Sequence, residues 1–189
     1  MKPSPTPHEI HLGIAEQGKL MALKGDHREA LRHYREAIRL AVSGKAPEIF
    51  FRHYTQCVLE SLEHSESYDE VIRFCTDADA HYRKLNVTDD LHRRDHGSIL
   101  ERAGIVHLKA GRTEVGRAAL EKAVQVAGAD VLPLAEEVLR WLSRGYAVDR
   151  ARLHSAQQRH GQYVVRKEKV DKRIARQLPK RVGETPAVL

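Results

Sequence analysis

The residues of this chain best suited to metal or catalytic chemistry are its histidines, which number 12. His92 and His96 have the i, i+4 spacing at which two imidazoles can share an ion on one helix face. No convincing third ligand accompanies them, and "HEIH" at His8 to His11 is one residue too short for the paired histidines of a zinc-protease helix. We therefore expect surface histidines and no metal site.

Other catalytic signatures are also missing from the sequence. It contains no glycine-rich phosphate loop, no nucleophile elbow and no spaced cysteine pairs. Cys57 and Cys75 fall on different expected helices, and we interpret both as small packing residues that a reducing compartment keeps as thiols. We interpret Trp141 as a core or interface anchor rather than a ligand platform. The sequence thus predicts a protein that is not an enzyme and needs no cofactor.

The composition is that of a globular chain that favours helices. Of the 189 residues, 41% are hydrophobic and 31% are charged, while glycine and proline number only 12 and 7. No apolar run approaches the roughly 20 residues that a helix needs to cross a bilayer. The N-terminus, "MKPSPTPHEI", lacks the hydrophobic centre of a signal peptide. We expect a cytoplasmic protein without a membrane span.

The net charge of +6 is not spread evenly along the chain. From Met1 to Val148 there are 21 basic and 22 acidic residues, whereas from Asp149 to Leu189 there are 11 basic and 4 acidic residues. The excess positive charge therefore belongs to the C-terminal tail, and the rest of the chain is close to neutral.

Apolar residues recur at helical spacing in one segment after another, and no segment shows convincing strand alternation. The fold class that follows is all-α. The alternate prolines of "KPSPTP" favour an extended, disordered arm over residues 1–7 before the first helix. The predicted helices span His8–Lys24, His27–Ser43, Pro47–His64, Tyr68–Leu85, Asp89–Ala110, Glu114–Gly128 and Val131–Tyr146, with a last one inside Asp149–Leu178.

The turns between these helices precede a repeated pattern. "LKGDHREA", "HSESYDEV" and "KAGRTEVG" are short enough to force antiparallel hairpins. A small or slim residue follows each turn, then a larger one four residues on and an alanine three further. The three copies are Ala30, Tyr34, Ala37; Val71, Cys75, Ala78; and Gly116, Leu120, Ala123. Gly18 and Gly104 precede the first and third turns, so we expect close helix contacts there.

This pattern resembles the tetratricopeptide repeat (TPR) family, which couples small residues in both helices of a hairpin to a large residue in the second. The resemblance implies a right-handed α-solenoid of antiparallel hairpins over residues 8–146, closed by a capping helix at 131–146 and followed by a basic C-terminal helix or tail at 149–189. The equivalent turns are 41 and 45 residues apart, beyond the family's typical value of about 34. We therefore expect about three repeats with lengthened helices and a deep groove.

In this family the first helix of each hairpin lines a concave groove that binds an extended peptide or a partner helix. The corresponding positions here are Leu12, Ala15, Lys19, Leu23, His53, Gln56, Glu60, Glu63, Ser98, Glu101, Ile105 and Leu108. This groove is expected to be acidic at its centre and apolar at its ends, which suits a ligand with Lys or Arg between hydrophobic anchors. It does not resemble a basic carboxylate clamp, because only Lys19 and Arg102 have the required charge.

The C-terminal tail has the composition of such a ligand. Val170, Ile174 and Leu178 are four residues apart, so a helix there would be basic and amphipathic. Three hypotheses stay open: the tail folds back into the groove until a partner displaces it, it binds an acidic partner or nucleic-acid phosphates as an independent arm, or it only adds solubility. The basic residues concerned are Arg166, Lys167, Lys169, Lys172, Arg173, Arg176, Lys180 and Arg181.

These patterns predict a non-enzymatic protein-protein interaction module, an adaptor, scaffold or chaperone that binds a protein or peptide segment in its groove. The alternative is a nucleic-acid-associated regulator whose repeats assemble a complex while its basic tail contacts phosphates. Either function is compatible with self-association through the outer helix face or the Trp141 helix.

Overall fold

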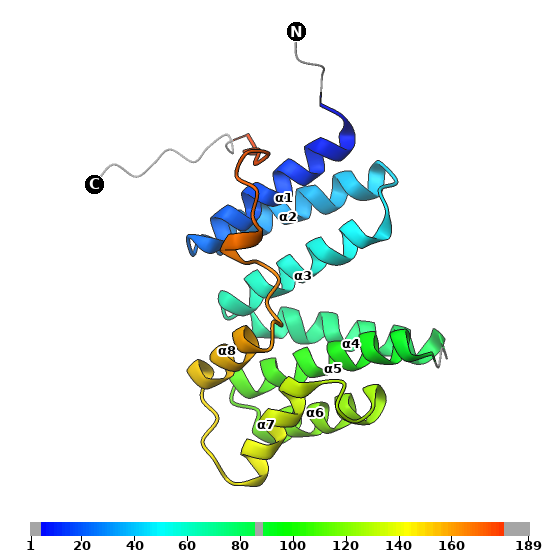
Figure 1. Cartoon of the computed structure of the whole chain (residues 1–189), viewed down its shortest axis with the longest axis vertical. Coiled ribbons are helices and arrows are strands. Elements are labelled where there is room, and N and C mark those ends of the chain that lie inside the picture. The colour runs from blue at the N-terminus through cyan, green and yellow to red at the C-terminus, as the bar shows by residue number, and fades with distance from the viewer. Residues whose placement is uncertain (1–4, 86–88, 180–189) are drawn as a thin grey trace, which may run out of the picture. The chain divides into compact units, whose positions relative to one another are not determined.

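The computed structural model describes residues 5–85 and 89–179. Within these residues the chain forms eight α-helices and one short 3-10 helix and contains no strand, which confirms the all-α prediction (Figure 1). No helix in this part of the chain has the length and apolar character needed to pass through a lipid bilayer.

The helix bounds follow the apolar pattern closely. The elements are α1 (Pro7–Leu23), α2 (His27–Ser43), α3 (Glu48–His64), α4 (Tyr68–Leu85), α5 (Asp90–Lys109), α6 (Thr113–Ala127), α7 (Pro133–Ser143), α8 (Arg150–Arg159) and the 3-10 helix η1 (Lys167–Lys169). Asp26, Asp89 and Asp149 each cap the helix that follows by accepting a backbone N–H. The short polar turns therefore set where these helices begin.

The first helix begins one residue before its predicted start at His8. Helix α1 begins at Pro7, and Thr6 and Glu9 form a capping box in which the Thr6 N–H donates to Glu9 Oε2 at 2.7 Å. Proline suits the first helical position because an N–H there would have no partner within the helix. Residues 1–4 of the predicted arm lie outside the described residues.

The chain divides into two compact units. Unit 1 comprises Met1–Ser61 together with Val164–Leu189, and unit 2 comprises Leu62–Tyr163. Helix α3 contributes to both, since the boundary falls near its C-terminal end. The C-terminal segment thus belongs to the same unit as the first helices, although it follows unit 2 in the chain.

In unit 1, α1 and α2 form a hairpin (Figure 1). Small residues lie where the two helices approach each other. A Cβ atom at Gly18 would lie 2.7 Å from the Tyr34 ring, so the ring takes the space of the missing side chain. Ala30, Tyr34 and Ala37 are fully buried. Gly25 closes the turn with φ = +83°. The first copy of the repeated pattern therefore packs as predicted.

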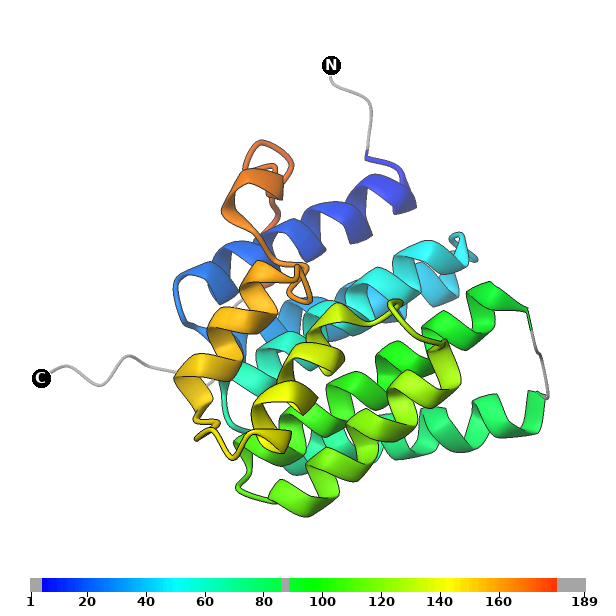
Figure 2. The same ribbon diagram turned by 60° about the horizontal axis from the view of Figure 1, so that its bottom comes forward.

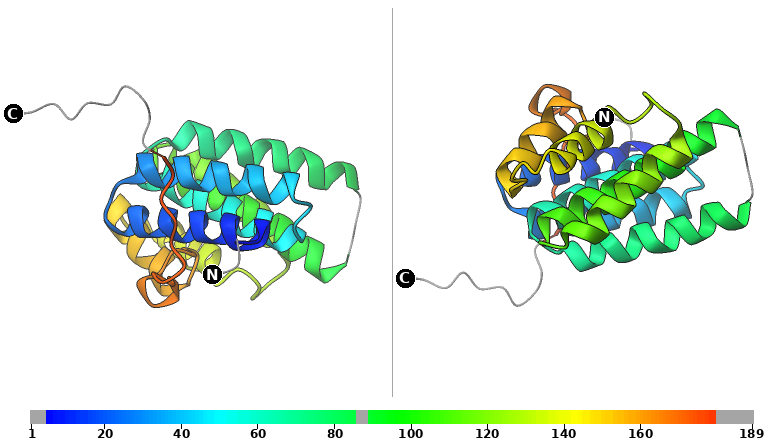
Figure 3. Two further views of the ribbon diagram at one scale, coloured as in Figure 1. Left: turned by 90° about the horizontal axis from the view of Figure 1, so that it is seen from above. Right: turned by 90° about the horizontal axis from the view of Figure 1, so that it is seen from below.

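The same construction recurs in unit 2 between α5 and α6, which lie side by side in Figures 2 and 3. A Cβ atom at Gly104 would lie 2.6 Å from Leu120, and one at Gly116 would lie 2.7 Å from Leu108. Leu120 and Ala123 are fully buried. The third copy is thus also confirmed, with two glycines allowing the two helices to approach closely.

The second copy of the pattern is looser. Val71 and Cys75 on α4 are buried, but Ala78 is only half-buried. Cys57 and Cys75 are free thiols inside the protein, and burial raises the pKa of each to about 12. Both act as packing residues, as predicted.

Helix α7 covers the apolar core of unit 2, as expected of the capping helix, and α8 adds to it. The buried residues that the two helices contribute are Leu134, Ala135, Val138, Leu142, Leu153 and Ala156. Trp141 is partly buried and packs at the edge of this core. The Arg152 guanidinium carbon lies 4.1 Å from the Trp141 ring centroid, so Trp141 connects α7 to α8.

The predicted amphipathic helix over the basic tail does not form. Helix α8 occupies only Arg150–Arg159, and the chain from Gln162 to Pro179 is non-helical apart from η1 and a turn at 172–174. An α-helix would use the backbone N–H groups internally. Here several of them donate instead to side chains of α1, α2 and α3 in unit 1.

Candidate functional site

Residues 164–179 lie on the helices of unit 1, and we call them the docked segment. The left panel of Figure 3 shows this part of the chain crossing α1 and α2. The segment belongs to unit 1 although it is distant in sequence from the helices that hold it. Main-chain atoms of the docked segment make most of its polar attachments, so the surface accepts an extended backbone.

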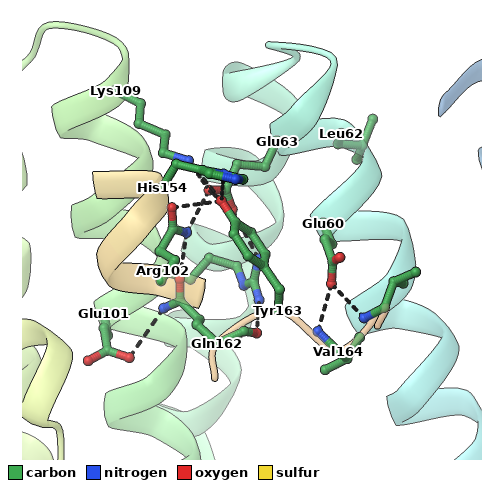
Figure 4. Close-up of polar contacts among 12 residues, drawn as sticks. Glu60, Leu62, Glu63, Glu101, Arg102, Lys109, His154, Gln162, Tyr163 and Val164 are labelled. Carbon is green, nitrogen blue, oxygen red and sulfur yellow. Dashed lines mark hydrogen bonds and ion pairs between the residues drawn. The ribbon is translucent and has the colours of Figure 1, made fainter. Parts of the chain in front are cut away.

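Two buried glutamates of unit 1 accept backbone N–H groups of the docked segment. Glu60 Oε2 accepts from Val164 at 2.7 Å and from Val165 at 3.2 Å (Figure 4). Glu16 Oε2 accepts from Asp171 at 2.8 Å. An ionised acceptor strengthens such bonds. Because they end on main-chain N–H groups, they require an extended chain rather than particular side chains.

The far end of the docked segment is held by two side chains of α2. The Leu178 N–H donates to His33 Nε2 at 3.3 Å, and Arg32 Nη1 donates to the Pro179 carbonyl at 3.0 Å. His33 Nδ1 lies 2.8 Å from the Glu29 carbonyl oxygen, which can only accept. The imidazole therefore donates through Nδ1 and accepts through Nε2, which is the arrangement of its neutral form.

Gly13 on α1 provides the closest backbone approach to the docked segment. Its carbonyl accepts the Arg176 N–H at 2.8 Å. A Cβ atom at Gly13 would lie 2.5 Å from the Ile174 carbonyl oxygen and 2.7 Å from Arg176 Cγ. Any side chain at this position would collide with the docked segment.

Two aliphatic side chains anchor the docked segment in apolar clusters. Val165 is 9% exposed and joins the cluster that contains Tyr34 and Cys57. Leu178 packs against the cluster that contains Ile14 and Tyr54. Burying such a side chain contributes on the order of 2 kcal/mol. The anchors therefore add affinity and side-chain selectivity to the backbone contacts.

In unit 2, the buried carboxylate of Glu63 accepts its hydrogen bonds from side chains alone (Figure 4). Glu63 is 2% exposed and accepts from Arg102 at 3.1 Å, Lys109 at 2.7 Å, Gln157 at 2.6 Å and Tyr163 at 3.2 Å. Burial acts to raise the pKa of Glu63, but the Arg102 and Lys109 cations outweigh it and hold the pKa below its ordinary value. This cluster ties α3, α5, α8 and the residues after α8 into one core.

Glu101 provides a helix cap from a neighbouring element. Helix α7 has no side-chain cap of its own, and Glu101 Oε2 accepts the Ala135 N–H at 2.9 Å. Gln162 Nε2 also donates to Glu101, at 3.2 Å. Burial raises the pKa of Glu101, against the lowering effect of these two bonds. Glu101 therefore has a structural role as the cap of α7.

The residues expected to line a groove differ in exposure. In unit 1, Ala15, Lys19 and Glu60 are buried, Leu12, His53 and Gln56 are half-buried, and Leu23 is exposed. In unit 2, Glu63, Glu101, Ile105 and Leu108 are buried and Ser98 is exposed. Ile105 and Leu108 form part of the apolar core of unit 2. The acidic residues of the expected groove already hold atoms of this chain.

The basic tail residues are mostly directed to solvent. Lys167, Lys169, Lys172, Arg173 and Arg176 are exposed and Arg166 is half-buried. Lys180 and Arg181 lie outside the described residues. The charged side chains of the tail therefore take little part in holding it on unit 1.

The expectation of surface histidines is wrong for His11 and His33, which are 2% and 0% exposed. His11 Nδ1 lies 2.8 Å from the Tyr54 hydroxyl, so a neutral hydrogen bond accompanies its burial. His92 and His96 pair with different aspartates, each at 2.6 Å. Across residues 5–85 and 89–179, no three or more metal-ligating side chains gather into a possible site.

Four residues that hold the docked segment were not identified from the sequence: Gly13, Glu16, Arg32 and His33. Gly13 offered a signal, because a glycine inside a helix costs about 1 kcal/mol relative to alanine and so suggests a close contact. Glu16 and His33 offered none, since acceptors on helix surfaces are common and their partners are far away in sequence.

No protein-family model, curated protein or solved structure matches this chain. The assignment of a function therefore depends on its own residues and contacts.

Proposed function

We propose that this chain is a non-enzymatic, TPR-like protein-interaction module that acts in the cytoplasm as an adaptor, scaffold or chaperone. Unit 1 binds an extended polypeptide, and the chain's own docked segment occupies that surface until a partner displaces it. The docked segment carries the proposal, because backbone hydrogen bonds hold it on helices whose small-residue packing resembles that of TPR hairpins.

The contacts of the docked segment define the partner's chemistry. The N–H groups of Val164, Asp171 and Leu178, which are accepted by side chains of unit 1, are spaced seven residues apart. A partner therefore presents an extended backbone without proline at those positions, because proline has no N–H. Its aliphatic anchors correspond to Val165 and Leu178.

Charge adds a second requirement on the partner. Among the buried side chains that the structure describes in unit 1, the carboxylates of Glu16 and Glu60 outnumber the one cation, Lys19, which pairs with Glu16 at 2.6 Å. Basic side chains beside the anchors favour association through charge complementarity. The partner is therefore an extended, basic segment with aliphatic residues near both ends.

The proposal is tested by binding a labelled peptide of sequence "QYVVRKEKVDKRIARQLP" to the full chain. In the wild type, the docked segment competes with the peptide at an effective concentration of about millimolar. Val165→Asp places a charge in the apolar cluster and releases the segment. We expect this variant to bind the peptide about tenfold or more tightly than the wild type does.

Gln177→Asp is the matched control, because it makes the same charge change at an exposed position of the docked segment. It should bind the peptide as weakly as the wild type. Hydrogen exchange of the Asp171 and Leu178 amides checks whether each variant has released its segment. Release in Val165→Asp without a gain in peptide binding would contradict the proposal.

A further inference from the structure

The attached positions of the docked segment alternate with two turns that carry its positive charge. Unit 1 holds the backbone at 164–165, at 171 and at 176–179. Between these positions lie η1, with Lys167 and Lys169, and the turn at 172–174, with Lys172 and Arg173. Docking therefore orders both basic turns without using their side chains.

The cations on these turns are available to a ligand. Lys167, Lys169 and Lys172 are exposed, and none forms an ion pair with any residue that the structure describes. Arg173 pairs with Asp171 at 2.8 Å, yet its side chain is 90% exposed. The docked segment thus presents several positive charges on the surface of unit 1.

We propose that the docked segment, while held on unit 1, binds the phosphate backbone of nucleic acid through the lysines of its two basic turns. Lysine and arginine contacts to phosphates supply affinity that does not depend on base sequence. Residues 164–179 contain no tryptophan or phenylalanine and no tyrosine on which bases could stack. Contacts to phosphates are therefore the mode that this surface supports.

A membrane surface fits the segment less well. Ile174, at 42%, is the single large apolar side chain of the docked segment among the exposed hydrophobic residues of the described chain. Interfacial membrane binding depends on buried apolar area together with charge. The surface therefore favours nucleic acid over an anionic bilayer.

Nucleic-acid binding by this surface requires only that the segment is docked, and it is a function separate from the proposed binding of a polypeptide. An ordered basic surface loses less conformational entropy on binding than a free arm does. A polypeptide that displaces the segment therefore lowers the affinity of the protein for nucleic acid. Bound nucleic acid lowers the affinity for that polypeptide by the same factor.

The test measures binding of the full chain to a fluorescein-labelled oligothymidylate and to a DNA duplex, each of about 20 nucleotides per strand, over about 50 to 200 mM salt. The variant combines Lys167→Ala, Lys169→Ala and Lys172→Ala. We expect its affinity at low salt to fall by about tenfold or more, and its salt slope for the single strand to fall by about 2. The two probes separate single-strand from duplex binding by the same lysines.

The matched control removes the same number of charges elsewhere, through Lys24→Ala, Lys84→Ala and Arg140→Ala, all of which are exposed. It should keep the wild-type affinity within about twofold, since screening limits long-range effects. Equal losses in both variants would mean that only net charge matters and would overturn the proposal. Binding to vesicles of anionic lipid, without binding to either oligonucleotide, would also overturn it.

Discussion

Glu63 in unit 2 differs in its hydrogen-bond partners from Glu16 and Glu60 in unit 1, although all three are buried. In unit 2, Glu63 accepts from Arg102 and Lys109, which lie on α5 and remain in place within that unit. In unit 1, Glu16 and Glu60 accept backbone N–H groups of the docked segment, and Glu16 also pairs with Lys19 at 2.6 Å. Side-chain partners make the first carboxylate part of a permanent core, whereas backbone partners allow one extended chain to replace another.

Because of this difference, we expect Glu63 to matter for the stability of unit 2, and Glu16 and Glu60 to matter for binding on unit 1. Removing Glu63 takes away the carboxylate that pairs with two buried cations, Arg102 and Lys109. Releasing the docked segment instead lets water replace its N–H groups at Glu16 and Glu60, and the ion pair of Glu16 with Lys19 does not depend on the segment. Variants in unit 2 should therefore change folding, and variants on the segment-binding surface of unit 1 should change docking.

The largest expected effect is that of Glu63→Leu in unit 2. It removes the carboxylate with which the buried Arg102 and Lys109 cations both pair, so we expect a loss of about 3–5 kcal/mol in the free energy of unfolding. Denaturant unfolding measures the loss. Glu66→Gln is the control, because its ion pair with Arg150 is exposed and should contribute only about 0–1 kcal/mol. Equal effects of the two variants would remove the distinction between a buried and an exposed carboxylate.

Overpacking the hairpin of α5 and α6 should have the next largest effect. Gly104→Ala places a Cβ atom 2.6 Å from Leu120 and 3.0 Å from the Gly116 carbonyl. We expect a loss of about 1–3 kcal/mol, measured by thermal or denaturant unfolding. Adding Leu120→Ala should cost less in the Gly104→Ala background than in the wild type, because there the loss of the Leu120 side chain also relieves its collision with the new Cβ atom. Additive losses would argue against this contact.

Acid should weaken unit 2 through the ionisation of Glu63. Its pKa in the folded protein is below the ordinary value of 4.5, so its stabilisation is complete above that value. The stabilisation is lost as the pH falls through the folded pKa. The difference in unfolding free energy between the wild type and Glu63→Gln should therefore shrink as the pH falls from neutral to acid. A constant difference would show that the Glu63 charge contributes nothing.

The smallest effect on global stability should come from Gly13→Ala in unit 1. Alanine favours the helix by about 1 kcal/mol, which offsets part of the lost docking energy. The collision with Ile174 and Arg176 should nevertheless release the docked segment and speed exchange of the Asp171 amide. Gly44→Ala, at the end of α2, is the control and should leave that exchange unchanged. Slow exchange in Gly13→Ala would show that the segment tolerates a side chain there.

The local features of the fold could be read from the sequence. Turn residues and helical spacing predicted α1 to α7 closely, and the small-residue pattern predicted the burial of Ala30, Tyr34 and Leu120. The site was predicted only in part. Glu60 was placed on the binding surface, but its contact with the Val164 backbone was not foreseen. Amphipathic spacing in the tail suggested a helix, which did not form.

The sequence by itself determined the helices and the close contacts within their hairpins, because spacing, caps and small residues act over a few turns of chain. Tertiary structure decided that residues 164–179 adopt a largely extended path and that Glu16 bonds the Asp171 backbone, 155 residues away. A backbone N–H is the same in every residue except proline, so no sequence pattern marks which one meets a distant carboxylate. That choice depends on the folded surface that the segment meets.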